Sequence, residues 1–211
     1  MSVKAMPIAS QVLLVLLLLC LGCCSITSAF KMGSPEDMSY WQSEVRRVQN
    51  YTAELYMAKI STMDNVSTLP SGLRLTVVKR GHGDVAPAED DLCEVHYTLY
   101  YHYESIIEDT RRRARPVKRR PSDLVPGMKE AMELMREGDR FFLHLPYYLA
   151  YGTDSSKDGK VKPYTNLRCD LEVVKCESPK GKTSEEIEDF LKPHLKLPMP
   201  PKTAPVNDDD L

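Results

Sequence analysis

Apolar residues recur every three or four positions in the first part of the chain, which is the spacing of one face of an α-helix. Ser34 precedes Pro35 and two acidic residues, an order typical of a helix start. The apolar stripe that follows consists of Met38, Trp41, Val45, Val48, Thr52 and Leu55. It can pack on the chain's own domain, or on a second copy as a homodimer seam through the 35–60 helix. Packing on the own domain is favoured because the pattern lasts less than three heptads.

From residue 69 the pattern changes to short segments with alternating apolar and polar positions, as in half-buried strands. These segments are 73–78, 94–100, 140–145 and 167–176. A short amphipathic helix is expected over 126–135 and a last helix over 183–195, with a flexible tail from Leu197. Several strands with one helix between them predict an α+β fold, in which a curved antiparallel sheet wraps around that helix.

Residues 1–29 have the pattern of a secretory signal peptide. Lys4 precedes the apolar run 12–21, and small residues follow at 27–29, so cleavage is expected after Ala29. Retention as a membrane anchor is the alternative, but the run is shorter than the roughly 18 to 20 apolar residues that a bilayer needs. A bacterial lipoprotein signal fits less well, because Cys20 stands where that motif requires an aliphatic residue.

Removal of the signal leaves three cysteines, Cys93, Cys169 and Cys176, in an oxidising compartment, so at most one disulfide forms. A Cys93–Cys176 bond and three buried thiols both remain open. Two glycosylation sequons begin at Asn50 and Asn65 and agree with a secretory route. Asn50 lies off the apolar stripe, so a glycan there is expected to leave the stripe free to pack.

The chain ends in Asp-Asp-Asp-Leu, which is similar to the KDEL-type retrieval signals of the endoplasmic reticulum. A solvated acidic tail is an equal alternative. The expected location is the secretory pathway and specifically the lumen of the endoplasmic reticulum, with secretion or membrane anchoring as alternatives.

Charge and motif content narrow the classes of function. The 28 basic and 30 acidic residues give a formal charge of -2, which excludes a nucleic-acid binder of strongly basic composition. Beyond the predicted signal peptide the sequence has no nucleophile elbow, Cys-x-x-Cys, His-Glu-x-x-His or phosphate-binding glycine loop, and its five histidines are scattered. We therefore expect no metal and no cofactor, and any catalysis has to depend on the shape of a pocket.

Eight short motifs follow one another between residues 69 and 177. They are Leu69-Pro70-Ser71-Gly72-Leu73, Gly81-His82-Gly83, Val95-His96-Tyr97-Thr98, Val125-Pro126-Gly127, Leu134-Met135 with Gly138-Asp139, Leu145-Pro146, Leu149-Ala150-Tyr151-Gly152 and the segment 166–173. In this order and spacing the chain resembles the FK506-binding (FKBP-type) peptidyl-prolyl isomerases, and most closely their secreted Mip-like branch. The resemblance implies a half-barrel of five or six antiparallel strands around one helix. It divides the chain into the signal peptide 1–29, an N-terminal helical segment 30–68, the isomerase domain 69–177, and a C-terminal helix with an acidic tail, 178–211.

The resemblance also implies a mainly aromatic pocket for a prolyl ring. Its catalytic positions are taken by Tyr97, by Glu108 in place of an aspartate, and by Tyr151, whose hydroxyl in the family bonds a substrate carbonyl. Its substrate-binding positions are taken by Ile107, Val117, Leu124, Val125, Met128, Val161 and Cys169. Four of these, Ile107, Val117, Met128 and Cys169, stand where the family has aromatic rings.

The activity implied is prolyl isomerisation that assists protein folding, with weak turnover and weak or absent macrolide binding. The reason is that Met128 replaces a flat tryptophan floor, and a flexible side chain defines the position of the prolyl ring poorly. The alternative is a non-catalytic FKBP-like chaperone or binding protein that uses the same cleft.

Seven basic side chains lie within the ten positions 111–120, which in the family form a bulge beside the pocket. This run is either a solvated loop or a device that steers acidic clients toward the pocket. The expected partners are therefore proline-containing polypeptides, acidic ones included. Nucleic acid is not expected as a partner, because the signal peptide directs the chain away from it.

Overall fold

The computed structural model describes residues 35–113, 115–198 and 200–201. The chain divides after Glu44 into two units, of which the first is described only for the start of helix α2 (Pro35–Ser61). The predicted signal peptide and the Asp-Asp-Asp-Leu end lie outside the described residues. Among the helices that are described, none combines the length and the apolar character needed to cross a bilayer.

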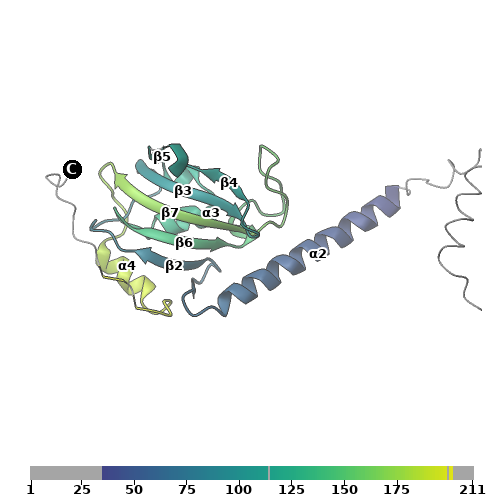
Figure 1. Ribbon diagram of the computed structural model, residues 1–211, viewed down its shortest axis with the longest axis horizontal. Helices are drawn as coiled ribbons and strands as arrows, with labels where there is room; N and C mark the ends of the chain where they lie inside the picture. The colour runs from purple at the N-terminus through teal and green to yellow at the C-terminus, as the bar shows by residue number, and fades with distance from the viewer. Residues whose placement is uncertain (1–34, 114, 199, 202–211) are drawn as a thin grey trace, which may run out of the picture. The chain divides into compact units, whose positions relative to one another are not determined.

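A seven-stranded antiparallel sheet is the framework of the second unit (Figure 1). Its order is β1 (Ser67–Thr68), β2 (Arg74–Lys79), β6 (Arg140–Leu145), β7 (Leu167–Cys176), β3 (Cys93–Tyr101) and β4 (Ile106–Asp109), with β5 (Val117–Arg119) also paired to β3. Strands β4 and β5 bind different stretches of the same edge of β3. The segment between them contains the 3-10 turn η2 (Arg111–Arg113) and much of the basic run, so the predicted bulge in a split edge strand is confirmed.

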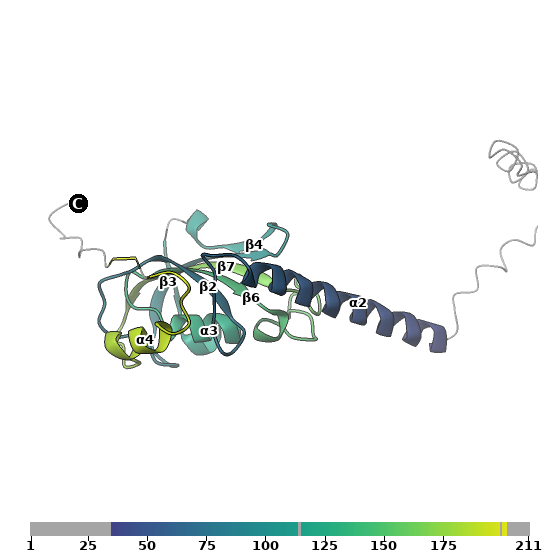
Figure 2. The same ribbon diagram turned by 90° about the horizontal axis from the view of Figure 1, so that it is seen from below.

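Helix α3 (Pro126–Met132) covers one face of the sheet (Figure 2). Alternate side chains of β7, such as Cys169 and Leu171, are fully buried on this face together with Met132 of the helix. Gly127 allows the close approach, because a Cβ atom there would lie 2.7 Å from Cδ2 of Leu145 on β6. Two further 3-10 turns, η3 (Pro121–Asp123) and η4 (Tyr147–Leu149), precede and follow this helix in the sequence. The predicted half-barrel around one helix is confirmed.

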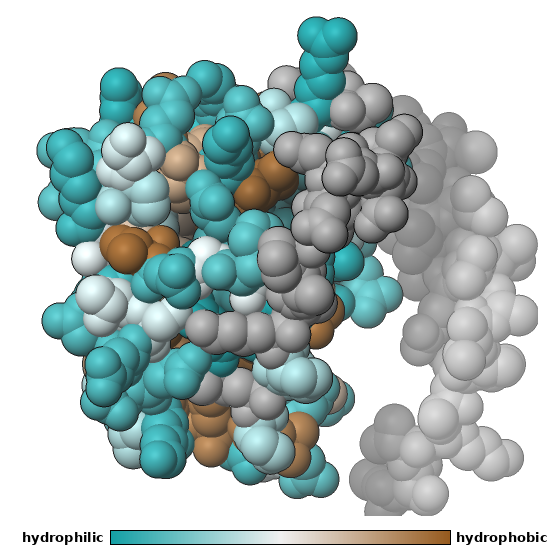
Figure 3. All heavy atoms as spheres, turned by 90° about the vertical axis from the view of Figure 1, so that its left-hand side faces the viewer, coloured by the Kyte–Doolittle hydropathy of each residue, from teal (hydrophilic) through white to brown (hydrophobic). Residues whose placement is uncertain are grey.

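Helix α4 (Ser184–Leu191) confirms the predicted last helix, which begins behind a Thr183 cap that pairs with Glu186. Its apolar side chains Ile187 and Leu191 are buried in the core. The chain stays attached after the helix, since the Lys196 amide donates to Ser67 Oγ at 3.0 Å. Figure 3 shows this end of the domain, where the described residues are mostly hydrophilic and the hydrophobic ones form small separate patches.

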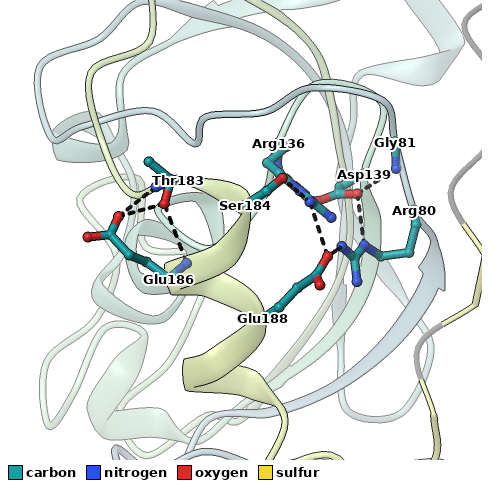
Figure 4. Close-up of polar contacts among 8 residues, drawn as sticks. All are labelled: Arg80, Gly81, Arg136, Asp139, Thr183, Ser184, Glu186 and Glu188. Atoms are coloured by element: carbon teal, nitrogen blue, oxygen red, sulfur yellow. Dashed lines mark hydrogen bonds and ion pairs between the residues drawn. The ribbon is translucent and has the colours of Figure 1, made fainter.

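Buried charges also hold α4 in place (Figure 4). Glu188 of α4 lies 2.8 Å from an Nη atom of Arg80 and 3.6 Å from one of Arg136. Asp139 contacts the same two arginines at 3.7 Å and 3.4 Å and accepts a hydrogen bond from the Gly81 amide. Two buried cations are thus matched by two carboxylates, one of which comes from α4.

The predicted packing of the α2 stripe on the chain's own domain is wrong. Trp41, Val45, Val48 and Leu55 are all more than half exposed. The side chains of α2 that enter the core are Ala53, Met57 and Ile60. These recur at steps of four and three on another face of the helix, so α2 has two apolar faces and uses only one of them within the unit.

A disulfide joins Cys93 to Cys176, directly across the ladder between β3 and β7. The sequence left open whether this disulfide forms or all three cysteines are buried thiols. The structure has the disulfide, and Cys169 is the buried free thiol. The bond joins β3 to the last strand, β7, and spans 83 positions of the sequence.

Candidate active site

A cavity of about 540 Å³ opens between β3, β4 and the loop that follows Tyr151. It is lined by Leu99, Ile106, Ile107, Glu108, Asp109, Arg112, Tyr151, Asp158, Lys160 and Val161. Four of these were predicted from the sequence: Ile107, Glu108, Tyr151 and Val161. Chain segments about fifty residues apart are therefore brought together, as the resemblance implied.

The other predicted site residues do not line this cavity and form the apolar layer of the core. Tyr97, Met128 and Cys169 are buried in the hydrophobic core, and Val117, Leu124 and Val125 pack against it half-buried. Met128 is only 3% exposed. A prolyl ring would therefore reach the side chain of Met128 only if neighbouring groups moved.

Tyr97 is the predicted hydroxyl residue with the largest pKa shift. Burial, together with Glu108, raises the pKa of Tyr97 to about 12, while Arg119 acts in the opposite direction. Glu108 and Arg119 are both within hydrogen-bonding reach of the hydroxyl. The phenol is protonated at neutral pH, and an acidic and a basic side chain lie near its hydroxyl.

Tyr151 follows the turn η4, where the amide of Gly152 donates to the carbonyl of Tyr147 at 2.8 Å. The glycine adopts φ +69°, a conformation that favours this residue type. Burial raises the pKa of Tyr151, and the nearby carboxylates of Asp158 and Glu108 add to the effect. Its hydroxyl is thus a hydrogen-bond donor over the physiological pH range, as a residue that binds a carbonyl oxygen must be.

Cys169 does not act as a nucleophile here. Burial raises the pKa of its thiol far above the usual range, so the reactive thiolate is absent at neutral pH. No group of three or more metal-ligating side chains occurs in the part of the chain that the structure describes. The described cavity offers one hydroxyl donor, Tyr151, and a small apolar wall among charged side chains.

The mouth of the cavity is charged, since five of its ten lining residues are ionisable acids or bases other than tyrosine. Most of these charges are paired locally: Arg112 lies 3.2 Å from Asp109, and Lys160 lies 2.9 Å from Asp158. A hydrogen bond from Ser156, followed by those of Lys160, lowers the pKa of Asp158 to about 2, so this carboxylate is ionised. Charged and apolar side chains therefore share the lining of the cavity.

Much of the predicted basic run is also neutralised within the fold. Arg111 contacts Glu172 at 2.7 Å and Asp170 at 3.7 Å, and Lys118 contacts Glu177 at 2.6 Å. These pairs leave less net positive charge for steering acidic clients than the sequence suggested.

Several site residues were missed. Arg119 was assigned only to the basic run, although it contacts Tyr97. Leu99 could have been found, because it lies two residues from Tyr97 on the same face of β3. Ile106, Asp158 and Lys160 carry no sequence signal of their own, since only the fold brings their loops to the cavity.

A second, more apolar groove lies elsewhere. A cavity of about 540 Å³ on the outer face of the sheet is lined in part by Ile60, Val78 and Phe142. It lacks the two tyrosines that the resemblance implicates, so the inner cavity remains the candidate active site.

The model of the FKBP-type peptidyl-prolyl cis-trans isomerases matches residues 83–174. The macrophage infectivity potentiator of Trypanosoma cruzi is 38% identical over 154 residues, which cover 71% of this chain and 78% of that protein. The chain therefore belongs to the FKBP-type peptidyl-prolyl cis-trans isomerases, which are enzymes. Within this family it is similar to the macrophage infectivity potentiators and to FkpA.

Bacterial relatives are more distant. A probable FKBP-type isomerase FkpA of Neisseria meningitidis is 27% identical over 63% of this chain and 48% of that protein, so the match spans about half of its length. Among solved structures, a peptidyl-prolyl isomerase of Pseudomonas syringae has a TM-score of 0.57 at 22% identity, covering 63% of this chain and 96% of that one. FkpA of Escherichia coli has a TM-score of 0.55 at 24% identity, with 71% and 75% covered. These structures support the fold assignment.

Proposed function

We propose that this protein is a prolyl isomerase of low turnover that assists the folding of proline-containing clients in the secretory pathway. The observation that carries the proposal is the position of Tyr151, a protonated, half-buried hydroxyl that lines a cavity with apolar Ile107 and Val161. A prolyl peptide bond rotates slowly because the barrier is about 18 to 20 kcal/mol.

The apolar wall and the hydroxyl lower this barrier by different means. The planar amide owes part of its stability to charge separation that water solvates, and the twisted transition state has less of it, so a dry wall favours the twisted form. The Tyr151 hydroxyl holds the substrate carbonyl in position while the bond turns. Each roughly 1.4 kcal/mol gained in this way accelerates the reaction about tenfold.

Low turnover follows from the missing rings. Ile107 supplies an aliphatic wall where the family has a phenylalanine, and the buried Met128 supplies no flat floor. Without these surfaces the prolyl ring has several orientations, and macrolide ligands lose the same contacts.

The experiment is a prolyl-peptide isomerisation assay on the chain from residue 30 onward, with Tyr151→Phe and Tyr103→Phe compared with the parent. Loss of one productive hydrogen bond predicts that Tyr151→Phe lowers kcat/KM about fivefold. Tyr103→Phe removes the same atom from an exposed ring outside the cavity and is the matched control. Equal rates for the parent and Tyr151→Phe would refute the assigned role, and addition of a macrolide tests whether the cleft accepts that ligand.

The second candidate is a non-catalytic chaperone that holds client segments in the same cleft. The charged mouth and the replaced rings favour it, because binding of an extended segment requires less precise shape complementarity than catalysis does. Turnover comparable to that of a fully aromatic family member would rule this candidate out. Turnover indistinguishable from the uncatalysed rate, with retained client binding, would favour it over the isomerase.

The lumen of the endoplasmic reticulum is the proposed location, with secretion or membrane anchoring as alternatives. The Cys93–Cys176 disulfide agrees with an oxidising compartment. One relative carries the name outer membrane protein MIP, from Legionella longbeachae. Blocking the C-terminal Leu211 and assaying the culture medium tests the proposal, because a retrieved protein would then escape to the medium.

We also propose that the exposed stripe of α2 binds a second copy of the chain. Val45, Val48 and Leu55 continue the spacing of a helix-packing face, but the unit packs a different face of the helix. A second α2 offers the same stripe, so an antiparallel pair is self-complementary, as a two-fold interface requires.

A further inference from the structure

The two glycosylation sequons lie in different structural environments. Asn50 is inside helix α2, three residues before Ala53 and seven before Met57, both of which are buried. It is therefore on the face of α2 that packs on the domain, and its Oδ1 atom is buried. Although Asn50 lies off the exposed stripe, a glycan there would block the other packed face, which the sequence did not reveal.

Asn65 is in the turn between α2 and β1, and it is exposed. Its backbone carbonyl accepts a hydrogen bond from Thr76 Oγ1 at 2.8 Å, which fixes the turn without using the side-chain amide. A sugar chain on this amide would extend into solvent and displace no packed residue.

Each sequon requires a free Ser or Thr hydroxyl. The two hydroxyls become hydrogen-bonded at different stages of folding. Thr52 Oγ1 donates within its own helix, to the carbonyls of Val48 and Gln49 at 3.0 and 2.9 Å, so it is engaged as soon as α2 forms. Ser67 is also buried in the finished fold, but its contact is the amide of Lys196, 129 residues downstream. During synthesis the Asn65 sequon therefore stays open until the end of the chain has emerged and docked.

We infer that Asn65 carries an N-linked glycan and that Asn50 does not. The inference rests on the proposed secretory route, whose lumen supplies a lipid-diphosphate-linked oligosaccharide as donor. In the transfer, a bond forms between Nδ2 of Asn65 and the anomeric carbon of the first sugar. The bond from that carbon to the diphosphate oxygen breaks, the lipid diphosphate leaves with the electron pair, and the amide loses one proton to a base.

The glycan would lie on the opposite face of the sheet from the candidate active site. Leu75 and Phe141 are buried under α3, so their neighbours Thr76 and Phe142 point to the outer face. Asn65 lines the groove on that outer face together with Thr76 and Phe142. A glycan at Asn65 therefore covers the edge of an apolar groove and leaves Tyr151 accessible to clients.

The test is expression in eukaryotic cells of the chain from residue 30 onward, placed behind a cleavable signal peptide of known efficiency. Entry into the lumen is then independent of residues 1–29, so failure of the proposed location does not affect the result. The parent, Asn50→Gln and Asn65→Gln are compared by intact mass before and after treatment with an N-glycosidase, and each is assayed for prolyl isomerisation.

The expected result is a single glycan on the parent and on Asn50→Gln, none on Asn65→Gln, and equal isomerase rates for the parent before and after enzymatic removal of the glycan. A glycan that persists on Asn65→Gln would place it at Asn50 and overturn the inference. A parent that has entered the lumen, as its disulfide shows, but carries no glycan would overturn it as well. The isomerase assay is read separately, so a glycosylated but inactive protein would refute the proposed function and leave the glycan assignment intact.

Discussion

Individual side chains determine the electrostatics and the shape of the candidate active site. Tyr97 and Tyr151 are hydrogen-bond donors at neutral pH, as tyrosines ordinarily are, and burial moves the pKa of each further above neutrality. The apolar substitutions around them remove rings without adding charge. At the scale of residues, the candidate site therefore keeps the hydroxyl donors that the resemblance implies and lacks the aromatic ring surfaces.

Replacement of Met128 by tryptophan tests this interpretation. We expect Met128→Trp to raise kcat/KM at least about tenfold, because a flat ring restores a defined position for the proline. Since Met128 is almost fully buried, the larger side chain is also expected to lower the free energy of unfolding by about 1 to 3 kcal/mol. The isomerisation assay and denaturant unfolding measure the two effects.

Met128→Leu is the matched control for this experiment. It changes the side chain without adding a ring, so its rate should stay at the parental level. A folded Met128→Trp protein with an unchanged rate would show that the missing floor does not limit catalysis.

His144 makes stability dependent on pH. Its side chain is buried on β6, and its Nδ1 atom lies 3.2 Å from the hydroxyl of Tyr56 on α2. Burial, with contributions from Arg168 and Arg74, lowers the pKa of His144 from 6.5 to about 4. Between these two values the unfolded chain binds the proton and the folded chain does not, so stability falls as pH drops from 6.5 toward 4.

The decrease in the free energy of unfolding that is assigned to His144 is at most about 3 kcal/mol, which follows from the difference between its pKa values in the unfolded and folded chain. Denaturant unfolding at pH 7 and pH 4.5 measures it for the parent and for His144→Asn, which does not titrate. The parent should lose more stability than the variant, while a His82→Asn control at an exposed position should behave like the parent. An identical loss in the parent and His144→Asn would contradict the assignment.

Helix α4 is held by charge as well as by apolar packing. Arg136 is fully buried and Arg80 nearly so, and the carboxylate of Glu188 reaches both. We expect Glu188→Gln to lower the free energy of unfolding by about 1 to 3 kcal/mol, because it leaves excess positive charge in a buried site. Chemical denaturation provides the measurement.

Glu185→Gln is the control for α4, because it removes an exposed carboxylate from the same helix. Its effect should stay within about 0.5 kcal/mol. Equal losses for Glu185→Gln and Glu188→Gln would mean that the buried network does not stabilise α4.

The elements differ in how far the sequence could predict them. Strands β6 and β7 were predicted to the residue, because their side chains alternate and turn residues bound them. Helix α3 was predicted three residues too long, since Leu134 and Met135 are buried in the turns after it and continue the apolar pattern.

Contacts between distant segments could not be predicted. The ion pairs of α4 join residues about fifty to one hundred positions apart, and no local pattern relates them. The same holds for Arg119 beside Tyr97 and for the strand register that brings Cys93 opposite Cys176. Motif order predicted four residues that share the cavity, but the charged side chains around them depend on loops that only the fold brings together.

At the scale of the whole molecule, the family match at residues 83–174 leaves α2 and α4 outside it. Helix α4 is integrated into the domain through buried residues and charges. Helix α2 instead presents a second apolar face to solvent, and six of its large apolar side chains are exposed: Tyr40, Trp41, Val45, Val48, Tyr51 and Leu55. Such a surface is costly in water unless another apolar surface covers it.

The proposed second copy leads to the last prediction. Val48→Glu places a charge at the middle of the exposed stripe, and Ser43→Glu places the same charge on another side of α2. Sedimentation velocity at micromolar concentrations should show a dimer for the parent and for Ser43→Glu, and a monomer for Val48→Glu. Because Val48 is exposed in the monomer, Val48→Glu should keep the parental free energy of unfolding at dilutions where the parent is also monomeric. A parent that sediments as a monomer at all concentrations would mean that a different molecule covers the stripe.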